Sequence, residues 1–267
     1  MRTFLKWAGN KQRMVARIIA LLPKGQRLIE PFVGSGALFL NSDYPAYLLA
    51  DSNGDLIDLY CRLQAEGNDF IDFCRTLFVA ENNTPDAFYS LRATFNGTED
   101  ARLKSALFLY LNRHGYNGLC RYNASGGFNV PFGRYKKPYF PQAEMEAFWE
   151  KSQTARFCQQ NFATTMQAAR PGDVIYCDPP YVPLSSTAHF TSYSAGGFGF
   201  DQQLALAAAA REAASRGVPV LISNHATPEI EEAYAGASFE RFQVQRYISA
   251  DANNRNAVGE LLALFRP

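Results

Sequence analysis

The sequence predicts an α/β fold: a doubly wound, mostly parallel sheet that ends in an antiparallel hairpin and carries a mainly helical insert. Three observations predict it. Short apolar runs alternate with helical segments toward both ends of the chain, the last two apolar runs follow one another directly, and the middle is helical and rich in loops. The chain has 267 residues, of which 47% are hydrophobic, so it can bury a large core.

The first half of the predicted sheet comes from two strands that each end at a polar turn. Residues 27–32 (RLIEPF) form an apolar run that leads into a Gly-Ser-Gly turn, after which ALFL begins a helix. Residues 47–51 (YLLAD) form a second run, which ends on Asp51 and precedes the helical segment DLIDLYCRL. Strand, helix and strand again indicate parallel pairing, with helices on both faces of the sheet.

The second half of the sheet lies near the end of the chain. Residues 174–177 and 218–223 are further predicted strands, and an alanine-rich helix over residues 202–216 separates them. Residues 239–248 and 260–265 are two consecutive strands without a helix between them, which predicts the closing hairpin.

Residues 55–157 interrupt this alternation. They contain several helices, one of them over residues 103–112, followed by a region rich in glycine, aromatic residues and arginine over residues 114–140. We therefore predict a catalytic, cofactor-binding domain made of residues 1–54 and 158–267, and a target-recognition domain over residues 55–157.

The charge distribution is uneven although the formal net charge is only +1. Residues 101–143 contain no Asp or Glu. Their positive residues are Arg102, Lys104, Arg113, Arg121, Arg134, Lys136 and Lys137. Such a segment favours a polyanionic partner, with a solvated basic face as the alternative.

Cysteine and histidine patterns exclude several classes of protein. The five cysteines are scattered, with no Cys-x-x-Cys spacing, and the three histidines have no metal-ligand spacing, so we expect neither a disulfide framework nor a metal site. No apolar run is long enough to cross a bilayer, and the start MRTFLKWAGNK lacks the apolar region of a secretory signal. We therefore expect no membrane partner and a cytoplasmic protein.

The two polar turns predict a nucleoside cofactor. Glycines at Gly34 and Gly36 allow close approach of a ligand to the backbone, and Asp51 at the next strand end can accept hydrogen bonds from both hydroxyls of a ribose. The turn lacks the spacing of dinucleotide-binding and phosphate-binding loops, which favours S-adenosylmethionine. Alternatively, the glycines form only a tight turn, and Asp51 caps the helix that begins near Asn53.

The segment VIYCDPPYVP predicts the chemistry. Asp178, Pro179, Pro180 and Tyr181 directly follow an apolar strand. The Asp178 carboxylate and the Pro179 carbonyl can accept the two protons of an exocyclic amine, which frees its lone pair to attack a methyl sulfonium, while Tyr181 stacks on the ring that carries the amine. A base in duplex DNA has to flip out to reach such a site. The alternative is an acid-proline turn that closes a core strand.

These motifs resemble the Dam-type DNA adenine methyltransferases, which methylate the adenine amine within GATC. The likeness covers nearly the whole chain in the family's order: FLKWAGNK, PFVGSGALFLN, RHGYNGLCRYN, FNVPFGRYKKPYFP, DPPY and VLISNH. It implies an S-adenosylmethionine-dependent methyltransferase fold, S-adenosylhomocysteine as product, and a monomer acting on double-stranded DNA that contains GATC.

The resemblance also implies roles for individual residues. Those lining the cofactor site would be Trp7, Lys11, Phe32, Gly34, Gly36, Asp51, Phe162 and Asp178. Lys6 would help to read the first base pair, Tyr116 and Asn117 would fill the gap left by the flipped base, and Leu119, Arg121 and Pro131 would read flanking bases. Further DNA contacts would come from Asn123, Arg134 and Lys136, the last two to phosphates.

The chain departs from the family's pattern in two places. Asn10 stands where the family usually has a second glycine. After Arg255, Asn256 and Ala257 stand where relatives have two lysines. The loss of these two positive charges predicts weaker DNA binding with a shallower salt dependence. Other possible substrates of the same chemistry are RNA, the amine of cytosine and a glutamine amide. In a different class, the chain would be a DNA-binding module without activity.

Overall fold

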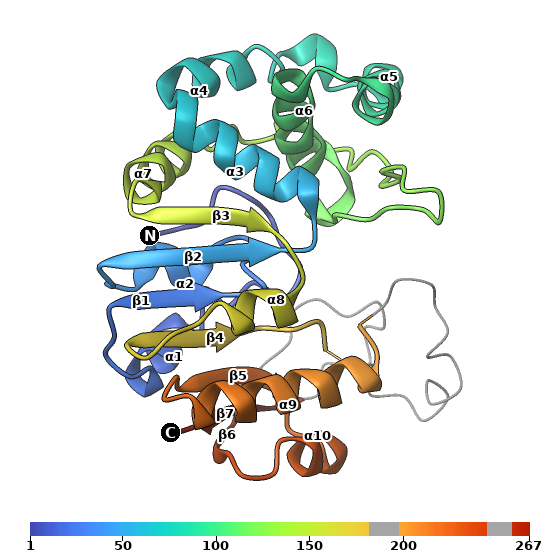
Figure 1. Cartoon of the computed structure of the whole chain (residues 1–267). Helices are drawn as coiled ribbons and strands as arrows, with labels where there is room; N and C mark the ends of the chain where they lie inside the picture. The colour runs from blue at the N-terminus through green and yellow to red at the C-terminus, as the bar shows by residue number, and fades with distance from the viewer. Residues whose placement is uncertain (182–197, 245–257) are drawn as a thin grey trace. The chain divides into compact units, whose positions relative to one another are not determined.

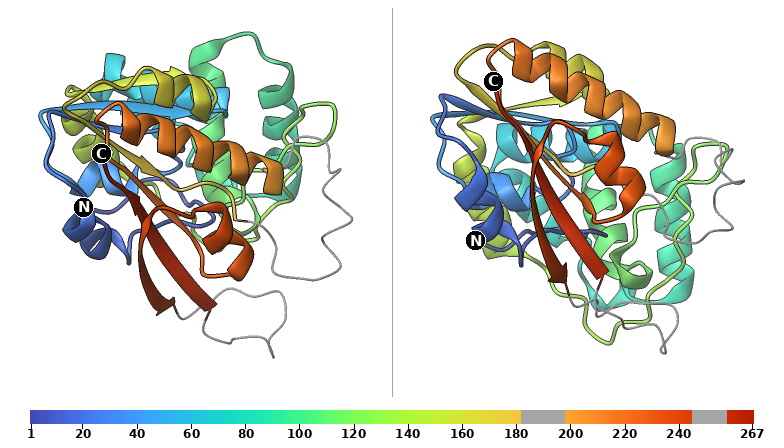
Figure 2. Two further views of the ribbon diagram at one scale, coloured as in Figure 1. Left: turned by 60° about the horizontal axis from the view of Figure 1, so that its bottom comes forward. Right: turned by 90° about the horizontal axis from the view of Figure 1, so that it is seen from below.

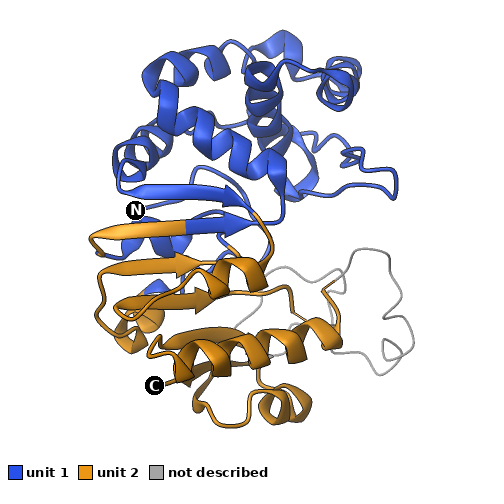
Figure 3. Ribbon diagram, in the orientation of Figure 1, with its two compact units in different colours: residues 1–15, 33–43, 49–159 blue, residues 16–32, 44–48, 160–267 orange. Residues whose placement is uncertain are grey.

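The computed structural model describes residues 1–181, 198–244 and 258–267 (Figure 1). It divides into two compact units (Figure 3). Unit 1 consists of residues 1–15, 33–43 and 49–159, and unit 2 of residues 16–32, 44–48 and 160–267. The predicted recognition domain, residues 55–157, lies within unit 1. Its separate function stays a prediction. No helix among the described residues is long and apolar enough to cross a membrane.

In the part of the chain that the structure describes, seven strands form one sheet in the order β3-β2-β1-β4-β5-β7-β6. The strands are β1 (Arg27–Glu30), β2 (Ala46–Asp51), β3 (Ala155–Gln159), β4 (Asp173–Cys177), β5 (Val220–His225), β6 (Ser238–Val244) and β7 (Val258–Phe265). Strand β4 pairs in parallel with β1 and β5, whereas β7 pairs antiparallel with both β5 and β6. The predicted fold class, including the terminal antiparallel hairpin, is confirmed.

Strand β3 is the one the sequence did not indicate. Its residues read Ala-Arg-Phe-Cys-Gln, and only Phe157 is buried. It lies at an edge of the sheet and has one neighbouring strand, β2. An edge strand with one buried side chain carries no apolar run, so periodicity could not identify it.

In unit 2, helices cover the strands on both sides. They are α1 (Val15–Leu21, of which Val15 belongs to unit 1), α8 (Phe162–Gln167), α9 (Phe200–Ser215) and α10 (Pro228–Ala233). Helix α9 buries Leu206, Ala210 and Ala213 at helical spacing. It lies on the face of the strands opposite α1 (Figure 2).

In unit 1, helix α6 is surrounded by other helices of the insert. The helices are α2 (Ala37–Asn41), α3 (Gly54–Glu66), α4 (Asn68–Arg75), α5 (Pro85–Gly97), α6 (Ala101–His114) and α7 (Gln142–Ser152), with short 3-10 helices η1 (Ala80–Asn82) and η2 (Tyr116–Gly118). Helix α6 packs against α3, α4 and α5, and every residue from Ser105 to Asn112 is buried. Asn53, Thr84 and Asp100 cap α3, α5 and α6 with side-chain oxygens.

Candidate functional site

Strand β4 ends at the Asp-Pro-Pro-Tyr segment. All five of its residues are buried, and it lies between the parallel strands β1 and β5. At its start, Arg27 makes a two-pronged ion pair with Asp173, with nitrogen–oxygen distances of 3.0 and 2.6 Å. Burial on both faces and this ion pair across to β1 fix the position at which the strand ends and Asp178 begins.

A serine of the neighbouring strand orients the Asp178 carboxylate. The Ser223 hydroxyl donates a hydrogen bond to Asp178 Oδ1 at 2.9 Å, and the Tyr176 hydroxyl donates to Ser223 at 3.1 Å. Burial, together with the charge of Asp178, holds the pKa of Tyr176 well above its usual range, so Tyr176 remains a donor. Asp178 itself is half-buried, with its carboxylate held in one orientation.

A buried polar network supports the two prolines. The Gln203 side-chain amide donates to the Pro180 carbonyl at 3.0 Å. Its own oxygen accepts hydrogen bonds from Asn224 at 3.0 Å and from the Tyr234 hydroxyl at 2.7 Å. Gln203 and Asn224 are fully buried, so each depends on these partners. Sequence reasoning missed both residues. The available signal for Gln203 was a glutamine on the inner face of an alanine-rich helix.

Tyr181 packs against a buried histidine. The Tyr181 ring meets the His225 ring edge to face, with centroids 4.4 Å apart. His225 is 5% exposed, ends β5 and lies opposite Glu260 of β7. Burial and the charges of Asp178 and Glu260 hold the pKa of Tyr181 well above its usual range, so the ring is neutral. His225 is a second supporting residue that the sequence did not single out.

The two phenylalanines predicted to line the cofactor site are in contact. Phe32 follows β1, Phe162 begins α8, and their rings stack with centroids 5.6 Å apart. Phe198 meets both rings edge to face. A base held between two rings needs roughly 7 Å between their centroids, twice a contact distance. An adenine between Phe32 and Phe162 therefore requires one ring to move.

In unit 1, the glycine turn and Asp51 form one arrangement. The Gly34 amide donates to Asp51 Oδ2 at 3.1 Å, and the Asn53 amide donates to Asp51 Oδ1 at 3.0 Å. Gly34 has a φ of +47°, and a Cβ there would lie 2.8 Å from the Trp7 indole nitrogen, so both backbone and space require glycine. Trp7, Gly34 and Asp51 are thus brought together.

Asp51 does not cap the following helix. The cap is Asn53, whose side-chain oxygen accepts the Leu56 amide at 3.1 Å. Burial raises the pKa of Asp51, while the backbone amides that donate to it act in the opposite direction. The alternative role of Asp51 as a helix cap is therefore wrong. Gly36, with a φ of +70°, is the N-cap residue that precedes α2.

Asn10, the departure from the family's pattern, ties down the segment that carries Lys11. Its amide nitrogen donates to Thr3 Oγ1 at 3.0 Å, and its oxygen accepts the Gln12 amide at 2.7 Å. Lys11 is 8% exposed and donates to the Gly9 carbonyl at 2.9 Å. A glycine at position 10 could make neither side-chain bond. The other departures, Asn256 and Ala257, lie outside the described residues, as does Arg255 before them.

A buried asparagine joins Lys6 to the residues predicted to contact DNA, which we call the recognition segment (residues 113–141). Asn112, 2% exposed, accepts the Lys6 amide at 2.9 Å and donates to the carbonyls of Lys6 and Gly118 at 2.7 and 3.2 Å. Gly118 has a φ of +62°, and a Cβ there would overlap the Lys6 side chain. The Lys6 ammonium lies 3.9 Å from the centre of the Tyr135 ring.

The tip of the recognition segment exposes Tyr116 and Asn117. Tyr116 is 51% exposed, and Asn117 has an unusual φ of +52°. The Tyr135 hydroxyl accepts the Asn117 amide at 3.0 Å, and the Pro131 carbonyl accepts the Tyr116 amide at 2.8 Å. These bonds hold both side chains at the surface. A strained backbone held by specific partners is a feature of functional sites.

The other residues predicted to contact DNA differ in their exposure and in the hydrogen bonds that they make within the protein. Arg121 is exposed, yet its guanidinium donates to the side chain and carbonyl of Asn129 at 2.7 and 3.2 Å. The Asn123 side chain accepts from Ser125 and Gly127 and so stabilises its own turn. Leu119 is half-buried. Exposed positions are Pro131, Arg134 and Lys136.

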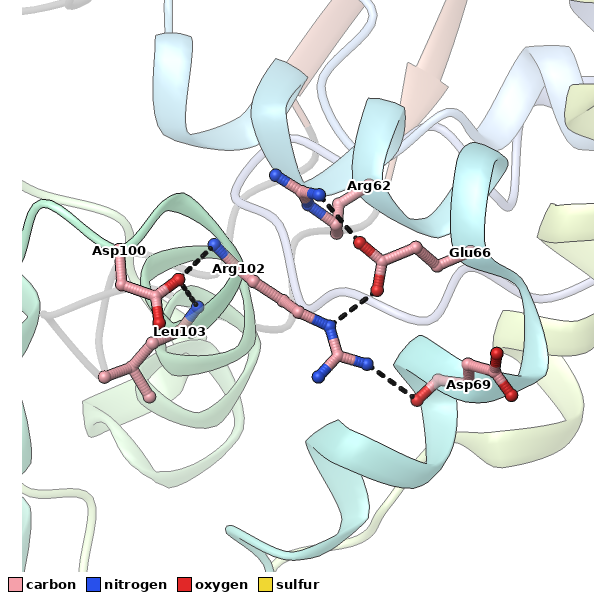
Figure 4. A network of polar contacts seen from close by, with 6 residues as sticks. All are labelled: Arg62, Glu66, Asp69, Asp100, Arg102 and Leu103. Atoms are coloured by element: carbon pink, nitrogen blue, oxygen red, sulfur yellow. Dashed lines mark hydrogen bonds and ion pairs between the residues drawn. The ribbon is translucent and has the colours of Figure 1, made fainter.

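Part of the basic charge is used inside the protein. Arg102 Nε lies 2.6 Å from Glu66 Oε2 and donates to the Asp69 carbonyl, while Arg62 binds the other Glu66 oxygen at 2.7 Å (Figure 4). Lys104 lies 2.9 Å from Asp55. Arg102 and Lys104, both on α6, are therefore paired with acids. This pairing weakens the prediction of a polyanionic partner, which rested on seven positive charges in the sequence. The exposed cations Arg134, Lys136 and Lys137 remain on the recognition segment.

The chain is similar along its whole length to proteins of known activity. DNA adenine methylases of Vibrio cholerae and Escherichia coli are 51% and 50% identical to it, over 100% of this chain and 96% of theirs. The DNA adenine methylase of Serratia marcescens is 51% identical over 99% of this chain and 98% of its own. The model of the D12 class N6 adenine-specific DNA methyltransferases matches residues 7–249. The chain therefore belongs to this family and is an enzyme that methylates adenine in DNA at N6.

Proposed function

We propose that the enzyme transfers a methyl group from S-adenosylmethionine to the N6 amine of an adenine that has flipped out of a GATC site in double-stranded DNA. The observation that carries this proposal is the end of β4, where Ser223 orients Asp178 beside two consecutive prolines. A carboxylate held in one orientation, next to backbone carbonyls that belong to no helix or strand, can accept hydrogen bonds from the two protons of an amine.

In the proposed reaction, Asp178 and the Pro179 carbonyl accept the two N6 protons, and Tyr181 stacks on the base. The N6 lone pair attacks the methyl carbon, so that a nitrogen–carbon bond forms as the sulfur–carbon bond breaks. The sulfur would be released as the neutral thioether of S-adenosylhomocysteine, and Asp178 would accept the one proton that the cationic N6 then loses. Positioning and charge supply the rate acceleration, because amine and carboxylate need not exchange a proton before attack.

Each part of the cofactor has proposed partners. Asp51 accepts the ribose hydroxyls, Gly34 and Gly36 allow close approach, and Trp7 and Lys11 complete this side. Phe32 and Phe162 flank the adenine ring. A buried carboxylate beside a glycine turn supports a nucleoside, and the absence of a phosphate-binding spacing from the sequence supports a sulfonium cofactor without a pyrophosphate.

The recognition segment is proposed to read GATC. Arg121 would donate two hydrogen bonds to a guanine, Leu119 or Pro131 would touch a thymine methyl, and Lys6 would contact the first base pair. Tyr116 and Asn117 would occupy the gap left by the flipped adenine. Asn123 would make a further DNA contact, and Arg134 and Lys136 would contact phosphates. One active site per chain makes a monomer sufficient.

The test is methyl transfer to two duplexes that differ at one base pair, one containing GATC and the other GTTC. Protein and radiolabelled S-adenosylmethionine are incubated with each duplex, and the label is assigned by nucleoside digestion. N6-methyladenosine from the GATC duplex alone supports the proposal. Equal label in both duplexes contradicts the assignment of Arg121 and Leu119. Label in neither duplex favours a binding module without activity.

A further inference from the structure

Tyr122 lies on the inner side of the recognition segment, directly after Arg121. Its backbone pairs with Phe128, so neighbouring side chains point to opposite sides. Arg121 is exposed, whereas the Tyr122 ring packs edge to face on Phe128 with centroids 5.7 Å apart. The orientation of Arg121 therefore depends on how Tyr122 is held.

Tyr122 is held by the first turn of α3. Its hydroxyl donates to Asp55 Oδ2 at 2.6 Å, and the other oxygen of Asp55 pairs with Lys104 at 2.9 Å. Burial, followed by the influence of Cys120 and Asp55, holds the pKa of Tyr122 far above its usual range. The hydroxyl is therefore a donor throughout the neutral pH range.

A second link runs through the cap of the same helix. The Asn53 side-chain nitrogen lies 3.4 Å from Cys120 Sγ, and the Asn53 backbone amide donates to Asp51. Asn53 thus contacts Asp51, the proposed ribose acceptor, through its backbone, and the recognition segment through its side chain. Three contacts connect the two places: Asn53 with Cys120, Asp55 with Tyr122, and a longer one of 3.5 Å between the Tyr122 hydroxyl and Asn53 Oδ1.

We propose that Tyr122 is a positioning residue which, together with Asn53 and Asp55, couples cofactor binding at Asp51 to the reading of DNA by Arg121. The inference rests on the function proposed above for Asp51 and Arg121. Both Asp51 oxygens already accept backbone amides, from Gly34 and from Asn53. Each of these oxygens can accept a second hydrogen bond, so a bound ribose would share its acceptor with the Asn53 amide. In the proposed coupling, the cap of α3 transmits the resulting change in the Asn53 bond to residues 120–122.

Coupling of this kind is reciprocal, which makes it measurable. If bound cofactor strengthens DNA binding by some factor, DNA strengthens cofactor binding by the same factor. The probe is S-adenosylhomocysteine, which cannot react. The coupling factor is the Kd for a GATC duplex without this probe divided by the Kd with it, and for the unchanged protein we expect about tenfold.

The variant is Tyr122→Phe, which keeps the ring and removes the hydroxyl. The coupling factor should fall at least threefold, and the preference for GATC over GTTC should fall with it. Tyr44→Phe is the matched control, because Tyr44 is also half-buried and donates a single hydrogen bond, 2.7 Å long, to the Pro23 carbonyl. Tyr44→Phe should leave the factor unchanged. A merely structural loss would weaken both Kd values and leave their ratio intact.

A second variant protects the test against misfolding of the first. Asn53→Asp keeps an oxygen that can cap α3 but loses the amide donor to Cys120, so the coupling factor should fall in part. The inference is overturned if the coupling factor of the unchanged protein is one, or if the coupling factors of both variants lie within twofold of that of the unchanged protein. If Arg121→Ala leaves the GATC preference intact, the proposed function fails instead, whatever the coupling factor.

Discussion

The end of β4 and the recognition segment are held in place by different means. Strand β4 has all five residues buried between two parallel neighbours. The recognition segment contains one short 3-10 helix and two isolated bridges, Gly115 with Phe132 and Tyr122 with Phe128. Polar side chains from α5 and α6 hold it instead. Examples are Arg92, which donates to the Val130 carbonyl at 2.9 Å, and Asn112.

This difference separates rate from selectivity. The proposed amine acceptors, Asp178 and the Pro179 carbonyl, directly follow a buried strand, in which no side chain can change without a loss of packing. The side chains proposed to read bases lie on a surface held by individual hydrogen bonds, where one substitution removes only one or two contacts. We therefore expect changes at the end of β4 to lower the rate of methyl transfer, and changes in the recognition segment to alter which DNA is used.

The largest effect should come from Asp178→Ala. Removing the carboxylate removes the proposed acceptor of an N6 proton, and single-turnover methyl transfer should fall by at least about 1,000-fold. Asp43→Ala, at an exposed aspartate, is the control and should have no effect. Binding of the GATC duplex should persist in the variant. Transfer within tenfold of the unchanged protein would refute the role given to Asp178.

The next effect concerns stability beneath the recognition segment. His114 is 1% exposed, its Nδ1 lies 2.9 Å from the Tyr110 carbonyl, and burial lowers the pKa of the imidazole to about 4. In the unfolded chain the His114 imidazole binds a proton near pH 6.5. Its contribution to the free energy of unfolding is therefore fully present above that pH and is lost as the pH falls toward 4. The loss from this residue should be about 3 kcal/mol.

Urea unfolding between pH 7 and pH 4 measures this loss. In His114→Phe the free energy of unfolding should be lower at pH 7 but should change less over that range, because one titrating group is gone. An unchanged pH dependence in this variant would show that other groups cause it.

A smaller effect should follow from Arg121→Lys, which keeps the charge but loses the two-pronged donor. The preference for GATC over a site altered at the guanine should fall by about 1–3 kcal/mol, or roughly 5- to 150-fold. The salt dependence of binding should stay the same. A variant with unaltered preference but weaker binding would make Arg121 a phosphate contact.

The smallest effect distinguishes free from paired cations. Arg134→Gln should reduce the slope of log K against log salt by about 0.9, the value expected for one phosphate contact. Arg102→Gln should leave the slope unchanged, because Arg102 forms an ion pair with Glu66 and donates to the Asp69 carbonyl (Figure 4). Equal changes in the two variants would contradict the distinction drawn between α6 and the recognition segment.

The sequence predicted elements that have a local signature. Strands β1, β2, β4 and β5 are apolar runs, and Asp51 and Asp178 could be placed at strand ends because turn residues follow them. Strand β3 was missed because its pairing, rather than its composition, makes it a strand. The end of β4 shows the limit of local reasoning: Asp178 was found, but its donor Ser223 lies 45 residues away.

Supporting residues were missed for the same reason. Asn112, Gln203 and His225 act through partners far along the chain, and each is an ordinary polar residue within a buried helix or strand. Charge counting failed in a related way. Arg102 and Lys104 lie in an acid-free stretch of sequence, yet acids of α3 neutralise them in space.

The contact between Gly118 and Lys6 restricts how this enzyme can vary in evolution. A branched side chain such as valine or threonine at position 6 would add an atom at Cβ, close to the space that glycine leaves free at position 118. The two positions are far apart in the sequence, but side chains at both would occupy the same space. In a library randomised at both, selection for activity should recover glycine at 118 together with an unbranched residue at 6, and a substitution at either site should depend on the other.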